Sequence, residues 1–386
     1  MSVNEPAVLP SVVPVGPVVP VVPVPVVPVP VPVPVPVVPA VVVASRQKAA
    51  LDSTLRFLAA FGGALTFFAL LMLIKGVNPF VAYKDMVVST LGDSSQIAGI
   101  LVRATPIVLA ALAVTIPARA GLINVGGEGQ LIIGGVAAMG VSLLNNGRIA
   151  GPLSLVLMAL AAGVAGGVWS AIAAVLRLRI GIAESVTTLL MNYIALDVMY
   201  FLIYDRWKDR AGSGQPATRP IGAGEHLPLW AGKRVHLGLL LALVSALIIY
   251  LLFRKTSWGF RLRVVGGNME AAKRSGLNVS SLIISAMFVG GALAGLGGFT
   301  QLAGAEFKLR SGFLAGYGYV AFLASWLARH RPIGVTAACV LLSTIAISGD
   351  SLQLDSKLPA ASVNVLMALV LLGVFGFSKK RKVAAT

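Results

Sequence analysis

The chain has 386 residues, of which 57% are hydrophobic and only 12% are charged. Because a soluble domain is about one quarter charged, a single water-soluble core is excluded and much of the apolar surface requires lipid as its solvent. The formal net charge is +17. The basic residues lie in short loops between apolar stretches, which is typical of membrane proteins and argues against nucleic-acid binding. One cysteine and three histidines form no metal-binding pattern, and we predict no catalytic residue.

The first 45 residues are rich in Val and Pro, and 13 of the chain's 22 prolines lie between Pro6 and Pro39. Proline removes helical hydrogen bonds, and unpaired backbone groups cannot sit in hydrocarbon. We therefore predict a disordered, extended cytoplasmic tail over residues 1–45. It serves either as a spacer or docking tail or as a dispensable extension.

Apolar stretches follow near residues 55–75, 96–116, 121–144, 152–176, 184–204, 237–253, 279–303, 313–327, 333–350 and 359–377. Most approach the ~20 residues that a helix needs to cross a bilayer. The stretch at 313–327 is short, which predicts a half-helix or a tilted partner of the next span. We therefore predict an all-α polytopic membrane protein of about ten transmembrane helices, some broken or half-spanning. The membrane domain covers residues 46–378, and a basic tail covers residues 379–386.

Orientation follows from the Lys and Arg residues. With the amino terminus in the cytoplasm, 18 of the 31 Lys and Arg residues fall on the cytoplasmic side. They include Arg119, Arg177, Arg179, Arg329, Arg331 and six residues within 254–278. This asymmetry predicts that both termini are cytoplasmic.

The cytoplasmic loop 254–278 contains the signals of a short helix. Asn268 is a good N-cap, Glu270 lies in the first turn, and Lys273 and Arg274 lie in the last, as the helix dipole favours. Gly276 is placed to end the helix. A helix of about seven residues is unstable alone. It must pack on its own membrane domain or on a cytoplasmic partner.

Two groups of polar residues interrupt the apolar spans. Charges within spans usually face a cavity or a partner, so we expect one group, near a glycine-rich break, to line a substrate path: Asn124, Glu128 and Gln130. The other group recurs on one helical face with an aromatic neighbour: Glu184, Thr188, Asn192 and Tyr193. The alternative for Glu128 is a structural role, in which a direct pair with Arg103 is possible but not favoured. The alternative for the second group is interhelical hydrogen bonding.

Several runs of residues resemble permease subunits of bacterial ABC importers of the branched-chain amino acid, ribose and nucleoside type. They are GGNMEAAKRSGLNVSSL with the following SAMFVGGALAGLGGFTQLAG, RAGLINVGGEGQLIIGG, ESVTTLLMNYIAL and GYGYVAFLASWLARHRPIG. The last departs from the usual small residues at Ser325, Trp326 and the Arg329–Arg331 run. The resemblance covers roughly residues 50 to 380 and is strongest to the nucleoside and simple-sugar branch.

The resemblance implies a non-catalytic permease of the bacterial inner membrane. It implies ABC ATPase subunits, a second permease chain (identical or related) and an extracytoplasmic substrate-binding protein as partners. It also implies that the loop carries a coupling helix fitting the ATPase, formed by Gly266, Gly267, Asn268, Glu270, Ala271, Ala272, Lys273, Arg274 and Gly276. The sequence has no GxxxxGK[ST] phosphate loop, which independently indicates that ATP is hydrolysed by another chain and that this one needs no cofactor.

The expected cargo is a nucleoside, with a simple sugar such as ribose or galactose as the alternative. Two other classes stay open at this point. An ion-coupled secondary transporter would need an internal coupling site, for which Arg103, Glu128 and Glu184 are the deep candidates. A membrane scaffold or receptor without transport would leave the polar residues of the spans unexplained.

Overall fold

A computed structural model describes residues 41–212, 214–230, 234–356 and 361–376. The chain divides into two units, Met1–Leu51 and Asp52–Thr386. Of the first unit the structure describes residues 41–51, which are helical. The predicted tails at 1–45 and 379–386 lie outside the described residues, apart from residues 41–45. All that follows concerns the second unit.

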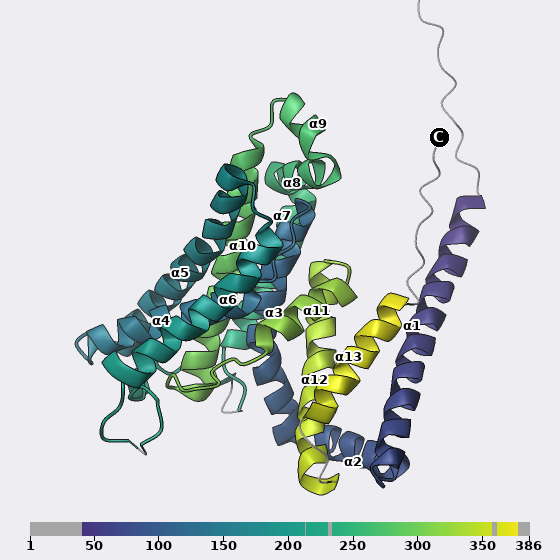
Figure 1. The fold of residues 1–386 in the computed structure, drawn as a ribbon, viewed down its shortest axis with the longest axis horizontal. Coiled ribbons are helices and arrows are strands. Elements are labelled where there is room, and N and C mark those ends of the chain that lie inside the picture. Colours follow the sequence, from purple (N-terminus) through teal and green to yellow (C-terminus); the bar gives the residue numbers. More distant parts are fainter. Residues whose placement is uncertain (1–40, 213, 231–233, 357–360, 377–386) are drawn as a thin grey trace, which may run out of the picture. The chain divides into compact units, whose positions relative to one another are not determined.

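The described part is built almost wholly from helices and contains no β-strand, only isolated bridges such as Lys208 with Thr218. The helices shown in Figure 1 are α1 (Val41–Ile74), α2 (Pro79–Leu91), α3 (Ser94–Arg119), α4 (Gly127–Asn145), α5 (Gly151–Ile180), α6 (Glu184–Phe201), α7 (Gly238–Lys255), α8 (Ser257–Gly267), α9 (Met269–Arg274), α10 (Val279–Gln301), α11 (Tyr317–Leu327), α12 (Pro332–Ser356) and α13 (Ala361–Gly376). Short π-helical turns, η1 (Leu202–Arg206) and η4 (Leu302–Glu306), extend α6 and α10. The predicted all-α membrane fold is confirmed.

Seven of the described helices are long and apolar enough to cross a membrane, or eight if α1 and α2 form one broken span. The chain bends by 116° between these two helices, and the sequence analysis did not predict this bend. The predicted short stretch is α11, which has 11 residues. Two features account for part of the difference from the predicted ten spans: this bend, and the 11-residue length of α11. The last predicted span, 359–377, is described only over residues 361–376, as α13.

Small residues let the central helices pack backbone against backbone. A side chain at Gly295 of α10 would overlap the Ala162 carbonyl of α5, and one at Gly298 would overlap the Leu131 carbonyl of α4. Such contacts are how helices associate where lipid offers no hydrophobic driving force. The glycines at 290–298 therefore serve helix packing. Helix α3 is buried along most of its length beside them.

Four of the predicted cytoplasmic groups lie together at one end of the bundle. The carbonyl of Arg119 lies against Gly266, and the Arg119 guanidinium is close enough to Arg263 and Arg331 to interact with them electrostatically. Arg177 pairs with Glu184 just beyond α5. We call this the α9 end, after the short helix that lies beyond α10 in Figure 1. The α4–α5 turn and the long loop between η1 and α7 lie at the opposite end.

Candidate functional site

The polar face of α6 binds the backbone where α3 and α4 are interrupted. Residues 120–126 are not helical, so their N–H groups need other acceptors. Glu184 Oε1 accepts from Ile123 N at 2.9 Å, and Thr188 Oγ1 accepts from Val125 N at 3.1 Å. One turn further on, Asn192 binds the backbone in and next to this segment through both the oxygen and the nitrogen of its side-chain amide. The predicted single face of Glu184, Thr188 and Asn192 therefore points at this break.

Asn192 joins the break to the start of α4. Its Oδ1 accepts from Gly129 N at 2.8 Å, and its Nδ2 donates to the Val125 carbonyl at 3.0 Å. A side chain at Gly129 would lie 3.0 Å from the Asn192 Cα, a tight contact, so the close approach of α4 and α6 favours glycine there. The polar face of α6 thus holds the break between α3 and α4 in place, whether or not it also binds a ligand.

Asn124 and Gln130 form a reciprocal amide pair inside this break. Gln130 Nε2 donates to Asn124 Oδ1 at 3.0 Å, and Asn124 Nδ2 donates to Gln130 Oε1 at 3.2 Å and to the Ala113 carbonyl at 3.1 Å. The two residues are 0% and 1% exposed. In this conformation both side chains are buried and bind protein groups, and their predicted place on the substrate path stays a prediction.

Glu128 caps the half-helix α11. Its Oε1 accepts from Gly316 N and its Oε2 from Gly318 N, both at 2.6 Å. The first turn of a helix has unpaired N–H groups and a partial positive charge, so a carboxylate is the fitting acceptor. Glu128 therefore binds backbone N–H groups, and not Arg103, the candidate partner considered in the sequence analysis. The Arg103 guanidinium lies 5.3 Å from the centre of the Tyr317 ring.

Sequence reasoning missed this cap, although Gly316-Tyr317-Gly318 was a usable signal. Gly316 has φ +84°, a conformation that glycine adopts without strain, and a side chain at Gly318 would overlap the backbone nitrogen of Glu128. Two glycines around one aromatic residue therefore mark where the chain turns into α11 and touches α4.

Two tyrosines border the broken helices. Tyr193, next to Asn192 on α6, is 58% exposed, and Tyr319 of α11 is 38% exposed. The Asn192 side chain lies within hydrogen-bonding reach of the Tyr319 hydroxyl. Tyr193 was predicted from its neighbours, whereas Tyr319 was not among the predicted site residues.

The predicted short helix in the loop 254–278 is present as α9. Asn268 caps it, with Oδ1 accepting from Ala271 N at 2.9 Å, and Gly276 beyond its end has φ +80°. Ala272 is buried, so one face packs on the membrane domain. Helix α8, which precedes α9, was not predicted.

The other side of α9 is exposed. Of the residues predicted to contact an ATPase, those exposed on α9 itself are Glu270, Ala271, Lys273 and Arg274. Gly266 lies against the Arg119 carbonyl and, with the buried Ala272, serves internal packing.

Comparison with known proteins decides the family. The model of the branched-chain amino acid transport system permease component matches residues 96–375. The chain belongs to this family.

Among similar proteins, a glucose ABC transporter permease of Haloferax volcanii is 35% identical over 77% of this chain and 80% of its own length. A guanosine ABC transporter permease of Bacillus subtilis is 31% identical over 79% of this chain and 88% of its own. A nucleoside ABC transporter permease of Lactococcus lactis is 29% identical over 78% and 85%. This multi-pass permease subunit is accordingly non-catalytic and works with a separate ATPase and a binding protein.

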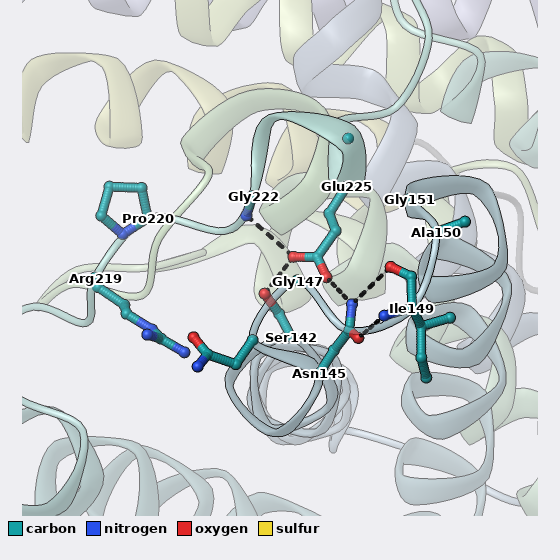
Figure 2. Close-up of a pocket in the computed structure, with 12 residues that line it drawn as sticks. Ser142, Asn145, Gly147, Ile149, Ala150, Gly151, Arg219, Pro220, Gly222 and Glu225 are labelled. Carbon is teal, nitrogen blue, oxygen red and sulfur yellow. Dashed lines mark hydrogen bonds between the residues drawn. The ribbon is translucent and has the colours of Figure 1, made fainter.

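At the end opposite α9, the permease has a polar pocket of about 450 Å³ between the α4–α5 turn and the loop before α7 (Figure 2). The pocket is lined by Glu225, which accepts four hydrogen bonds and which the sequence analysis did not single out. Glu225 accepts from Ser142, from Ser154 Oγ at 2.6 Å and from Asn145 Nδ2 at 2.9 Å. Gly222 N also donates to it, at 3.0 Å.

These donors decide the charge of Glu225. Burial raises the pKa of the carboxyl, but hydrogen bonds from Ser142, Ser154, Asn145 and Gly222 outweigh burial and leave the pKa below its usual value. Glu225 is thus an ionised clasp that ties the long loop to the α4–α5 turn.

Proposed function

We propose that this permease carries a nucleoside into a bacterial cell across the cytoplasmic membrane. The observation that carries the proposal is the meeting of two interrupted helical elements, residues 120–126 and the start of α11, beside the polar face of α6. Broken helices are tolerated within membranes where they line a cavity or are buried in protein. The guanosine and nucleoside permeases among the relatives support a nucleoside as cargo.

We further propose that the α9 end and both termini face the cytoplasm. Partner ATPases would bind ATP and press on the exposed face of α9, and α9 would pass the movement to α10, with which it is in contact. A second permease chain, identical or related, would complete the path. This chain itself would use no cofactor.

A simple sugar is the second candidate, because the glucose permease is also a relative and because hydroxyl groups suit the same polar residues. An ion-coupled secondary transporter is no longer a candidate, since the chain belongs to a family of ATP-driven permeases.

The test is reconstitution of the permease in liposomes with its ATPase and binding protein. ATP is enclosed in the liposome lumen, which corresponds to the cytoplasm. Uptake of labelled guanosine, uridine, ribose and glucose is then measured, and the measurement is repeated after the proton and sodium gradients have been dissipated. We expect ATP-dependent nucleoside uptake that survives loss of the gradients. Uptake of glucose or ribose without nucleoside uptake would replace the nucleoside with the sugar as cargo.

A further inference from the structure

The lengths of α6 and α11 indicate that the two exposed tyrosines lie near the middle of the membrane. Helix α11 ends at the turn where His330 lies close to Arg119, so its far end is at the α9 end of the bundle. Its 11 residues rise roughly 16 Å, about half of a ~30 Å hydrocarbon core. Tyr319, near its start, is therefore at mid-depth, and so is Tyr193 near the centre of the 18-residue α6.

Exposure at this depth needs an explanation. Tyrosine is enriched at membrane–water interfaces, where its hydroxyl is hydrated, and an unpaired hydroxyl in hydrocarbon is costly. Within the part of the chain that the structure describes, the Tyr193 hydroxyl has no hydrogen-bond partner. Two partly exposed tyrosines at mid-depth are therefore expected to face a path or another chain, since lipid would leave the hydroxyls unpaired.

The two tyrosines come from different helices but converge. The start of α4 is held between α6 and α11, with Gly129 against Asn192 and Gly127 against Gly318. Tyr193 and Tyr319 are close enough for their phenol groups to interact electrostatically, yet no contact between their rings is found among the described residues. Their exposed rings are thus available to a third group.

The Tyr319 hydroxyl lies close to the side-chain amide of Asn192. The Asn192 amide uses its oxygen for Gly129 N and one hydrogen for the Val125 carbonyl. Its second amide hydrogen can be donated to the Tyr319 hydroxyl oxygen, which is within reach. The hydroxyl then keeps its own proton for an acceptor on a ligand.

We propose that Tyr193 and Tyr319 form a contact site for the flat heterocyclic base of the transported nucleoside, with the Tyr319 hydroxyl donating to an acceptor on the base. This inference rests on the proposed function and names the part of the cargo that the site binds. Aromatic side chains stack on any base, which suits a path that must pass its cargo on without binding one base tightly.

The experiment compares Tyr193→Leu, Tyr319→Leu, Tyr193→Phe and Tyr319→Phe with the parent, in liposomes containing ATPase and saturating nucleoside-loaded binding protein. Tyr204→Leu is the matched control, because Tyr204 follows the same helix and is 56% exposed. We measure complex yield, ATP hydrolysis and nucleoside taken up per ATP. Each Leu variant should lower uptake per ATP by roughly tenfold with complex yield unchanged. Tyr193→Phe should behave as the parent, and Tyr319→Phe should fall between.

A direct readout of contact is cross-linking with a photoreactive azido-nucleoside, followed by mass spectrometry. Labelling at Tyr193 or Tyr319 that excess unlabelled nucleoside suppresses is expected. Leu variants that transport at the parent rate, or that fail to assemble because the tyrosines pack on a second chain, would overturn the inference alone. A parent that carries glucose and no nucleoside would overturn the proposed function together with it.

Discussion

Glu128 and Gly318 touch through both backbone and side chain. The Gly318 N–H donates to Glu128 Oε2 at 2.6 Å, while the Gly318 Cα lies so close to the Glu128 backbone that a side chain would overlap it. The half-helix α11 is thereby fixed to the start of α4, and this contact fixes where the two broken elements meet.

Gly318→Ala should separate α4 from α11. Overpacking of a tight contact costs about 1–3 kcal/mol, and the Glu128 cap would be lost with it. We expect lower thermal stability in detergent and loss of transport. Gly63→Ala is the control, because a side chain there meets nothing within 4 Å. Parent-like melting of Gly318→Ala would contradict the described contact.

Glu128→Gln should weaken the cap without adding bulk. A glutamine offers one carbonyl oxygen, so either Gly316 N or Gly318 N loses its acceptor, at about 1–3 kcal/mol for a buried group. The thermal midpoint and transport should both fall, while Asp205→Asn, an exposed carboxylate outside the site, should change neither. Transport loss at unchanged stability would instead favour direct contact of Glu128 with the cargo.

The exposed face of α9 can be tested by charge. Glu270→Lys combined with Ala271→Arg replaces a negative and a neutral side chain with two positive ones, a net change of +3, and should leave Ala272 packed. We expect normal amounts of permease in the membrane but at least tenfold lower uptake per ATP hydrolysed. The control is Arg148→Glu, which changes charge in an exposed turn at the opposite end. Unchanged coupling in the double variant would remove the assigned role of α9.

The Glu225 clasp should respond to acid. Because the pKa of Glu225 is lowered in the folded protein from its usual 4.5, its contribution to stability is complete above about pH 4.5 and is lost as the pH falls through the lowered value. Hydrogen exchange of residues 214–230, corrected for its intrinsic pH dependence, should be constant from pH 8 to 5 and rise in stronger acid.

Glu225→Gln separates this clasp from general acid unfolding. It should exchange faster in residues 214–230 already at pH 7, with little further change in acid below pH 4.5, because the ionised acceptor is absent. Equal protection of the parent and the variant at pH 7 would show that the ionised form is not what holds the loop.

Sequence alone determined the features that depend on local chemistry or on the solvent. Lipid demands long apolar helices, so the spans could be placed from composition and length. The cap of α9 joins Asn268 to Ala271, three residues away. The end of α9 depends on one glycine, Gly276. The i, i+4, i+8 spacing put Glu184, Thr188 and Asn192 on one face before any partner was known.

Only the tertiary structure decided what that face binds and which group Glu128 meets. The cap on α11 joins residues 188 and 190 positions apart, and the Glu225 clasp joins residues 71 to 83 apart. Such pairings depend on how helices pack, which here follows from glycine contacts between α4, α5 and α10. A charged residue in a span predicts that a partner exists. Whether that partner is a backbone amide, an arginine or a ligand depends on which helix packs beside the residue.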